Sequence, residues 1–239
     1  MGAVLATLAT LVILVLGGAF AVPYLVDWND YRDVFQAQAS RLMGRNVDVR
    51  GDVSLTILPV PQIAFQNVRI ADETGGFDAA IAEVQSFDMM LSLPALLTGA
   101  VEASSISLVK PVLRLSIDQN GQGNWRNLGM RDNGQIGPRA VALNGVAIKD
   151  GVIEITEADS GSIWRATSIT GTFAADSLQG PFKFNGAAMF GGLKHDVRFG
   201  AAKYADGKLN TKVSAQSAGG AQYAFDGALS GLDDKPQYS

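Results

Sequence analysis

Few residue types in this chain could support catalysis or hold a metal ion. The sequence contains no cysteine and a single histidine, His195. The lack of cysteine excludes disulfides, thiolate metal ligands and a cysteine nucleophile, and one histidine leaves little room for a zinc cluster or histidine-based catalysis. We find no ordered Ser, His and Asp set, no phosphate-binding glycine loop and no metal-ligand spacing. The sequence therefore predicts a protein that is not an enzyme, with no catalytic residue, metal or cofactor.

The segment 118–124 carries oxygen-containing side chains at alternate positions, a pattern that superficially resembles a calcium-binding loop. It lacks the spaced carboxylates and the final bidentate Glu of an EF-hand loop. Asn120 and Gly121 are instead a strong signal for a two-residue hairpin turn in which both residues take positive φ. We therefore predict a turn at this position.

Other polar residues have an equally simple interpretation. His195 lies between Lys194 and Asp196 at the expected start of a strand, where we predict that it is exposed. The acidic residues of segment 154–159 partly alternate with isoleucines, as on the solvated face of a strand. The formal net charge of −4 gives no basic surface for nucleic acid.

The chain begins with an apolar stretch that precedes all of these residues. Residues 1–26 carry no charged side chain, and about 20 apolar residues in a helix span the roughly 30 Å hydrocarbon core of a bilayer. We expect a retained transmembrane anchor over residues 1–26. Two alternatives stay open: a cleaved signal peptide, with a small-x-small site at Ala19-Phe20-Ala21, and a buried core helix. Basic residues follow the stretch and none precedes it, which taken alone favours a cytoplasmic C-terminal side.

Residues 27–44 are typical of a short amphipathic helix. Asp27 is a suitable N-cap and Gly44 a suitable residue just past the C-terminus. Between them, apolar residues such as Tyr31 and Phe35 recur at helical spacing. The helix either lies in the membrane interface, where Trp28 and Tyr31 would fit, or caps the sheet that follows.

From Val47 onward the hydrophobic period changes to two, the period of strands. A first strand is predicted through Val53, Leu55 and Ile57, a second up to about Ile70, and a longer one over Ala80–Leu93. Pro94–Gly99 predicts a single helical turn. Beyond it we expect strands only, so the chain is mainly β, with about 12 to 14 strands in total.

The sequence repeats itself at an offset of about 40 residues. Segment 106–117 resembles segment 146–156, and segment 182–188 resembles segment 223–229. We interpret these segments as recurring antiparallel hairpins. The prediction is one β-rich domain over residues 45–239, a curved antiparallel sheet with the shape of a groove.

Alternation along these strands places apolar side chains on one face, and no predicted helix covers it. Such a face must close on itself, pack on another sheet or hold something apolar. An ordinary sandwich core and a lipid-holding groove both remain possible. The candidate groove residues are Val53, Leu55, Ile57, Leu113, Leu115, Ile117, Ile153, Ile155, Phe182, Phe184, Val197, Phe199, Tyr223 and Phe225.

Several short segments, none of them specific alone, occur in an order and spacing that resembles the N-terminal part of the AsmA family of Gram-negative envelope proteins. The resemblance covers roughly the first 130 residues. The segments that carry it are Val26–Arg32, Leu42–Arg45, Val49–Val53, Ile57–Pro61, Asn67-Val68, Leu91–Gly99, Pro111 and Asp118–Trp125.

The resemblance implies a single-pass inner-membrane protein with its body in the periplasm. It implies a role in outer-membrane biogenesis and lipid transport, because the family is similar to bridge-like lipid-transfer proteins whose curved sheets hold acyl chains. The implied partners are phospholipid or another acyl lipid, the inner membrane and outer-membrane assembly proteins. A scaffolding envelope protein that acts through protein contacts is the alternative. The basic residues usual before the anchor are missing. The chain also stops at Ser239, short of typical members, so we expect a chain truncated at its C-terminal end or, as the alternative, a short member of the family.

Overall fold

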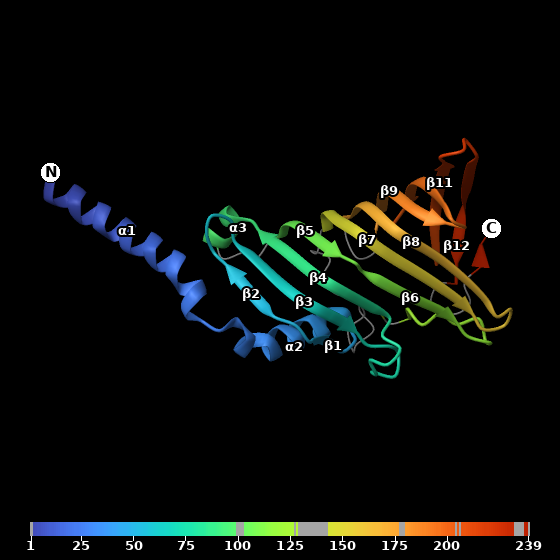
Figure 1. Cartoon of the computed structure of the whole chain (residues 1–239), viewed down its shortest axis with the longest axis horizontal. Coiled ribbons are helices and arrows are strands. Elements are labelled where there is room, and N and C mark those ends of the chain that lie inside the picture. The colour runs from blue at the N-terminus through green and yellow to red at the C-terminus, as the bar shows by residue number, and fades with distance from the viewer. Residues whose placement is uncertain are drawn as a thin grey trace.

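The chain forms one large β-sheet preceded by two consecutive helical segments (Figure 1). The computed structural model describes residues 2–98, 103–126, 128, 143–176, 180–203, 205, 207–231 and 237–238. All 13 strands among these residues belong to one sheet. The prediction that the protein is mainly β is therefore confirmed.

The helices lie at the N-terminal end of the chain, apart from one short helix between strands. They are α1 (Gly2–Leu25), the 3-10 helix η1 (Trp28–Tyr31), α2 (Arg32–Met43) and α3 (Leu93–Leu97). Figure 1 shows α1 projecting away from the sheet. Within the described residues, no helix has the length and hydropathy that a membrane crossing requires. The structure thus gives no support for the predicted transmembrane helix.

The predicted amphipathic helix is present as η1 followed by α2. The Asp27 carboxylate accepts a hydrogen bond from the Asn29 amide at 3.0 Å and so begins η1. Gly44 takes a φ of 66° and ends α2, as glycine does just past many helices. No residue of α2 is fully buried, so this helix lies on the surface of the body.

The strands follow one another in the sheet almost in chain order. The order is β1-β3-β4-β5-β7-β8-β9-β10-β11-β12-β13, with β2 paired to β3 and β6 paired to β4 and β7. Their bounds are β1 Val47–Val49, β2 Val53–Thr56, β3 Gln62–Ile70, β4 Ala82–Leu91, β5 Ala103–Val109, β6 Val112–Ile117, β7 Leu143–Glu157, β8 Ser162–Ala175, β9 Phe182–Phe190, β10 Leu193–Ala201, β11 Lys208–Ser217, β12 Gln222–Ser230 and β13 Gln237–Tyr238.

The prediction of a purely antiparallel sheet is wrong at its centre. Both β5 and β6 pair in parallel with β7. The register joins Ile106 to Val146 and Ile117 to Glu157, which is the offset of the internal repeat. Alternation alone does not distinguish parallel from antiparallel pairing, and the long connection between β6 and β7 permits a parallel crossover. The hairpins from β8 to β12 are antiparallel, as expected.

A line of left-handed residues crosses the middle of the sheet. Asn67 in β3, Lys110 between β5 and β6, Asp150 in β7 and Ser168 in β8 take φ of 53°, 48°, 54° and 49°. All four are exposed. Non-glycine residues seldom adopt this conformation, and inside a strand it bends the chain and redirects side chains. We call this line the kink.

The kink is accompanied by a change in the positions of the apolar residues. In β7 they are Val146 and Ile148 before Asp150, and Ile153 and Ile155 after it. The pairing of β7 with β8 shifts register between Ile148 and Ile153. The change from even to odd positions at a redirected residue allows one face of β7 to stay apolar along its whole length.

The molecule exposes far more surface than a compact protein of its size. Its accessible surface is 14850 Å² for a mass of 25.1 kDa, whereas a compact monomer of this mass exposes roughly 10,000 Å². Among the described residues, Ile81 is the largest side chain that is less than 2% exposed. The described strands form a single sheet, and α1 projects from it with exposed side chains, so the open sheet and the projecting helix both contribute to this excess.

Candidate functional site

Strand register aligns apolar side chains into two continuous rows across ten strands, from β2 to β12. We call them the phenylalanine row and the glycine row. The phenylalanine row is Leu55, Ile63, Met89, Ile106, Val146, Phe173, Phe184, Phe199, Val213 and Phe225. The glycine row is Val53, Phe65, Phe87, Leu108, Ile148, Gly171, Gly186, Val197, Ala215 and Tyr223.

The rows collect half of the predicted groove residues. Val53, Leu55, Phe184, Val197, Phe199, Tyr223 and Phe225 belong to them. Phe182 lies beside the phenylalanine row, where it pairs with Ala175 and Ala201. Beyond the kink, Leu113 pairs with Ile153 and Leu115 with Ile155 in a separate apolar group.

Two predicted groove residues lie outside these groups. Ile57 follows the end of β2 at Thr56, so the predicted strand is one residue too long. Ile117 pairs with Glu157 at the last position of β6. Sequence reasoning also missed row members in β3, β4, β5 and β7, although the same alternation could have identified them once their strands were paired correctly.

The apolar face is closed at one end and open at the other. Val53 is 4% exposed, whereas Phe225 is 40% and Tyr223 is 62% exposed. Phe184 and Phe199, between these ends, are half-buried. A filled core would bury such side chains almost completely, so this face is able to accept additional apolar atoms.

Helix α2 closes the end of the face that lies near β2. The Phe35 ring meets the Phe65 ring edge-on at 5.4 Å between centroids, and Phe65 lies 6.0 Å from Phe87. Such pairs of aromatic rings stabilise packing beyond the area they bury. An aromatic cluster therefore continues from α2 onto the start of the glycine row.

The same region of the chain covers the free edge of the sheet with side chains. Gln36 Oε1 accepts a hydrogen bond from the Val49 amide at 2.7 Å, and Ser40 Oγ accepts one from the Val47 amide at 2.9 Å. The Asn29 side chain accepts one from the Val53 amide at 3.0 Å. Edge amides without partners invite pairing with another chain, and these three acceptors occupy the positions that such a strand would take.

The positions that alternate with the rows are polar. Gln62 donates to Asp88 at 3.4 Å and Gln66 to Ser86 at 3.1 Å, between β3 and β4. Toward the other end of the sheet, Lys212 and Asp226 form an ion pair at 3.1 Å. The opposite face of the sheet is thus adapted to water, and the apolar rows define one side only.

Beyond the kink, oppositely charged residues of neighbouring strands form a second polar line. Glu83 lies between Arg69 at 3.4 Å and Arg114 at 3.3 Å. Arg114 is in register with Glu154, which is 3.7 Å from Arg165. These ion pairs are partly exposed, so they specify strand register more than they stabilise the fold.

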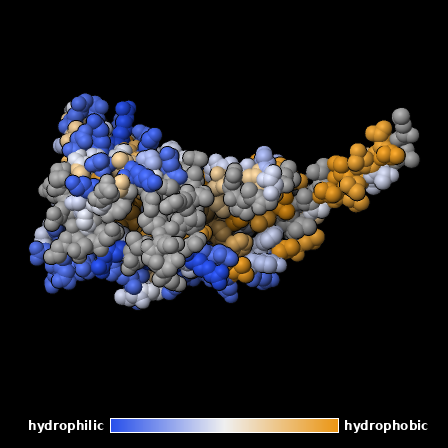
Figure 2. Space-filling view, turned by 180° about the vertical axis from the view of Figure 1, so that it is seen from behind, coloured by the Kyte–Doolittle hydropathy of each residue, from blue (hydrophilic) through white to orange (hydrophobic). Residues whose placement is uncertain are grey.

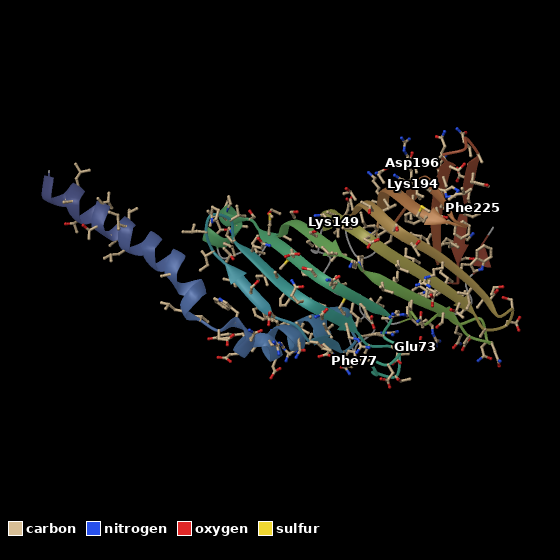
Figure 3. All side chains as sticks on the ribbon, in the orientation of Figure 1. Glu73, Phe77, Lys149, Lys194, Asp196 and Phe225 are labelled. Atoms are coloured by element: carbon tan, nitrogen blue, oxygen red, sulfur yellow. The ribbon has the colours of Figure 1, made fainter. Side chains whose placement is uncertain are left out.

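Arg45, in the segment that carried the family resemblance, joins two loops. Its Nη2 donates to the carbonyls of Asn124 and Arg126 at 2.6 and 2.7 Å, and it lies 4.0 Å from the Glu73 carboxylate. Burial lowers the pKa of Arg45, and the acidic side chains of Glu73 and Asp72 oppose that shift. Glu73 and Phe77 belong to the loop below the sheet in Figure 3.

Asp72 and Asp118 each organise a turn through hydrogen bonds to their carboxylates. The hydroxyl of Thr74 and the amides of Thr74 and Gly76 donate to Asp72. The hydrogen bond from the Thr74 side chain, followed by the amides, holds the pKa of Asp72 below its ordinary value. The amides of Gln122 and Asn120 lower the pKa of Asp118 in the same way.

The predicted turn at Asn120 and Gly121 is present, but its predicted geometry is wrong. Only Gly121 takes positive φ, at 77°, and its amide donates to the Asp118 carbonyl at 2.9 Å. The Asp118 carboxylate accepts the amide of Asn120 and so stabilises the ordinary right-handed turn that Asn120 enters. The prediction rested on the residue pair Asn120-Gly121 alone and did not take the Asp118 carboxylate into account.

His195 is 7% exposed, so the prediction that it is exposed is wrong. Strand partners flank it on both sides, at Ala188 and Ser217, and its ring lies 6.0 Å from the Tyr223 ring. Its Nδ1 is 3.0 Å from the Leu193 carbonyl oxygen. Lys194 and Asp196, its neighbours in sequence, point outward in Figure 3.

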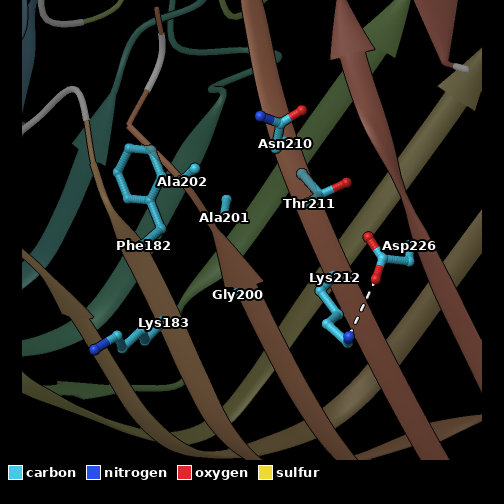
Figure 4. A pocket seen from close by; sticks show the side chains of 9 residues that line it. All are labelled: Phe182, Lys183, Gly200, Ala201, Ala202, Asn210, Thr211, Lys212 and Asp226. Carbon is cyan, nitrogen blue, oxygen red and sulfur yellow. Dashed lines mark ion pairs between the residues drawn. The ribbon is translucent and has the colours of Figure 1, made fainter.

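One open pocket lies at the start of β9, the end of β10 and the first part of β11, beside the middle of β12 (Figure 4). Its wall combines Phe182 and Ala201 with Thr211 and the Lys212–Asp226 ion pair. These side chains do not provide a nucleophile with an adjacent base. In the part of the chain that the structure describes, no group of three or more His, Asp or Glu is placed to hold a metal.

The chain was compared with models of known protein families, with curated proteins and with solved structures. The model of the AsmA family matches residues 2–232. Neither the curated proteins nor the solved structures contain a match.

Proposed function

Because the chain belongs to the AsmA family, we propose that it is a cell-envelope protein that holds the acyl chains of lipids on the apolar face of its sheet. The observation that carries this proposal is the phenylalanine row. It presents ten apolar side chains in unbroken register. They are buried at the centre of the sheet, where Ile106 and Val146 are 8% and 5% exposed, and open at β12, where Phe225 is 40% exposed.

The dimensions of the rows are suitable for acyl chains. Neighbouring strands lie about 4.8 Å apart, so ten strands place the ends of a row roughly 43 Å from each other. An acyl chain in one leaflet of a bilayer spans about 15 Å, half of the hydrocarbon core. The face is therefore long enough to hold such a chain lying across several strands, with aromatic rings along one side.

We further propose that α1 attaches the protein to the inner membrane and that the sheet lies in the periplasm. The helix has no charged residue, and its described apolar side chains are strongly exposed: Leu5 is 67% and Leu14 is 69% exposed. Side chains of this kind gain stability by moving from water into lipid. In Figure 2 the hydrophobic colour runs from α1 onto the neighbouring part of the body, while the far end is mainly hydrophilic.

Site-specific photo-crosslinking tests the lipid proposal. A benzophenone side chain at Phe199, in the phenylalanine row, is compared with one at Arg198, the next residue, which is exposed on the other face. We expect crosslinks to phospholipid from position 199 and none from position 198. Crosslinks from position 199 to protein alone would instead indicate a scaffolding role. Extraction with alkaline carbonate tests attachment through α1, and release of the protein into the soluble fraction would contradict it.

A further inference from the structure

Three exposed apolar side chains gather at one end of β8, β9 and β10. Trp164, Phe190 and Leu193 are 57%, 46% and 60% exposed. The rings of Trp164 and Phe190 stack at 6.3 Å with an angle of 7° between their planes, and Phe190 is directly opposite Leu193 in register. We call these three residues the exposed cluster. Scattered exposed apolar residues are ordinary, but contiguous ones mark contact surfaces.

The exposed cluster lies beside a tight hairpin turn. Between Phe190 and Leu193, Gly191 and Gly192 take φ of 58° and 79° and form a two-residue turn. No atom lies within 4 Å of the position that a side chain at either glycine would take. The hairpin tip is therefore narrow and unobstructed, and the stacked rings of Trp164 and Phe190 lie beside it.

The exposed cluster is also continuous with apolar positions inside the sheet. Trp164 is opposite Ile155, which is opposite Leu115. An apolar molecule could therefore pass from the exposed cluster to the half-buried face beyond the kink without crossing a charged row. This continuity distinguishes the exposed cluster from an isolated surface patch.

The charged residues next to the exposed cluster in sequence lie on the other face of the sheet. Arg165 and Lys194 alternate with Trp164 and Leu193 along their strands. On the side of the cluster, Glu157 is in register with Ser162, two residues before Trp164. Because the cluster presents no Lys or Arg of its own, it offers no attraction to anionic lipid and fits zwitterionic headgroups. Tryptophan adds an indole ring, a side chain that favours the boundary between headgroups and acyl chains.

The area of the exposed cluster argues against a second copy of the chain. A large aromatic side chain buries about 150 to 250 Å² when fully covered, so three half-exposed side chains offer roughly 300 Å² per copy. Two copies would bury about 600 Å² together, less than the roughly 1,200 Å² of a stable protein interface. Insertion of a few side chains into a bilayer does not require a minimum buried area of this size.

We infer that the exposed cluster of Trp164, Phe190 and Leu193 is a second lipid contact, which inserts into the surface of a bilayer that α1 does not occupy. This inference rests on the proposed function, because the contact would serve to pass acyl chains between that bilayer and the apolar face. It predicts binding to zwitterionic vesicles that is insensitive to salt.

Tryptophan fluorescence provides the first test. The chain contains three tryptophans, so the Trp28→Phe, Trp125→Phe variant of the full chain retains Trp164 alone. It is reconstituted through α1 into phosphatidylcholine and phosphatidylethanolamine vesicles, and acceptor vesicles of the same lipids with brominated acyl chains are added. We expect quenching of Trp164 by the acceptor vesicles. Fluorescence that the brominated vesicles leave unchanged would overturn the inference.

Vesicle tethering provides the second test and its controls. Trp164→Gln and Phe190→Ser should reduce tethering of acceptor vesicles about tenfold, while Trp164→Phe retains it. Ile163→Gln is the matched control, because Ile163 is 67% exposed and adjacent in β8 but outside the exposed cluster. Circular dichroism confirms that each variant is folded. Tethering that is unchanged in Trp164→Gln would contradict a lipid contact. A variant that changes the oligomeric state of the protein and leaves tethering unchanged would point to a protein interface instead.

Analysis of co-purified lipid separates this inference from the proposed function. Quenching of Trp164 in a protein that carries no bound phospholipid would refute the proposed function and leave the lipid contact standing. Bound phospholipid in a protein whose Trp164 is not quenched would refute the lipid contact and leave the proposed function standing.

Discussion

Lys110 and Asp150 occupy equivalent places in the two copies of the repeat, and both take left-handed φ, at 48° and 54°. Between them the strands remain paired, since the Lys110 amide donates to the Lys149 carbonyl at 2.8 Å and the Val152 amide donates to the Pro111 carbonyl at 2.8 Å. Because both strands bend at the same level, the parallel ladder passes through the kink without losing its register. The repeat thus encodes a shared deformation as well as a shared hydrophobic pattern.

Substitutions at Asp150 should change stability in opposite directions. Asp150→Gly removes the steric cost of the left-handed conformation and should raise the free energy of unfolding by about 0.5 to 1 kcal/mol. Asp150→Val places a β-branched residue there and should lower it by about 2 kcal/mol. Denaturant unfolding measures both. Lys149→Val, at the preceding exposed position, is the control, and an equal loss there would show that φ is not the cause.

The contact between β8 and β9 requires glycine. Gly171 and Gly186 face each other, and a Cβ at Gly186 would lie 2.3 Å from the Thr170 carbonyl oxygen. Gly186→Ala should therefore destabilise the protein by about 1 to 3 kcal/mol. Gly200→Ala in β10 should change stability by less than about 0.5 kcal/mol, because nothing lies within 4 Å of a Cβ at Gly200. Equal effects in urea unfolding would contradict this explanation.

The acceptors on α2 should protect the edge of the sheet. Gln36→Ala and Ser40→Ala each remove the partner of an edge amide and should cost about 1 kcal/mol. Hydrogen exchange of the Val47 and Val49 amides should accelerate in the corresponding variant. Gln38→Ala, at an exposed position of the same helix, is the control. Unchanged exchange in the Gln36 and Ser40 variants would show that α2 does not protect the edge.

Stability should fall in acid through Asp72 and Asp118. Their pKa values are lower in the folded protein, because hydrogen bonds from Thr74 and from the Gln122 amide favour the ionised carboxylates. Their contribution is therefore complete above the unfolded pKa of about 3.9 and is lost as pH falls through the lower folded values. The Asp72→Asn, Asp118→Asn variant should show a smaller decrease in melting temperature between neutral pH and pH values below about 3.9.

The exposed Asp196→Asn is the matched control for that experiment. A change in the double variant that Asp196→Asn does not reproduce would be due to the two turn carboxylates and not to the loss of any exposed carboxylate. An identical acid transition in the double variant and the unmodified protein would show that other groups control acid unfolding.

Hydrophobic period was enough to locate most strands, because alternation depends only on neighbouring residues. The helix after Asp27 and the turn near Gly121 were predictable for the same reason, because each depends on residues that are close in sequence. The parallel pairing of β7 was not predictable in this way, since it depends on the path of a long connection. For the same reason the row that joins Ile106, Val146 and Phe173 could not be assembled from the sequence alone.

The remaining errors arise where tertiary contacts override a local signal. His195 looked exposed because its neighbours in sequence are charged, yet strands on both sides and Tyr223 cover it. Asn120 looked suited to positive φ, yet the Asp118 carboxylate holds its amide in a different turn. The exposed cluster needed the register of β9 and β10, because Trp164 and Phe190 are far apart in sequence.

The two edges of the sheet are unlike each other, and this gives the molecule a direction. One edge is occupied by Gln36, Ser40 and Asn29. At the other, β13 pairs only with Leu229 and Ser230, so within the described residues the outer side of β12 from Gln222 to Ala228 has no strand beside it. Further strands could therefore be added at that side alone. Any longer sheet built on this body would grow away from α1, so that α1 would always lie at its starting end.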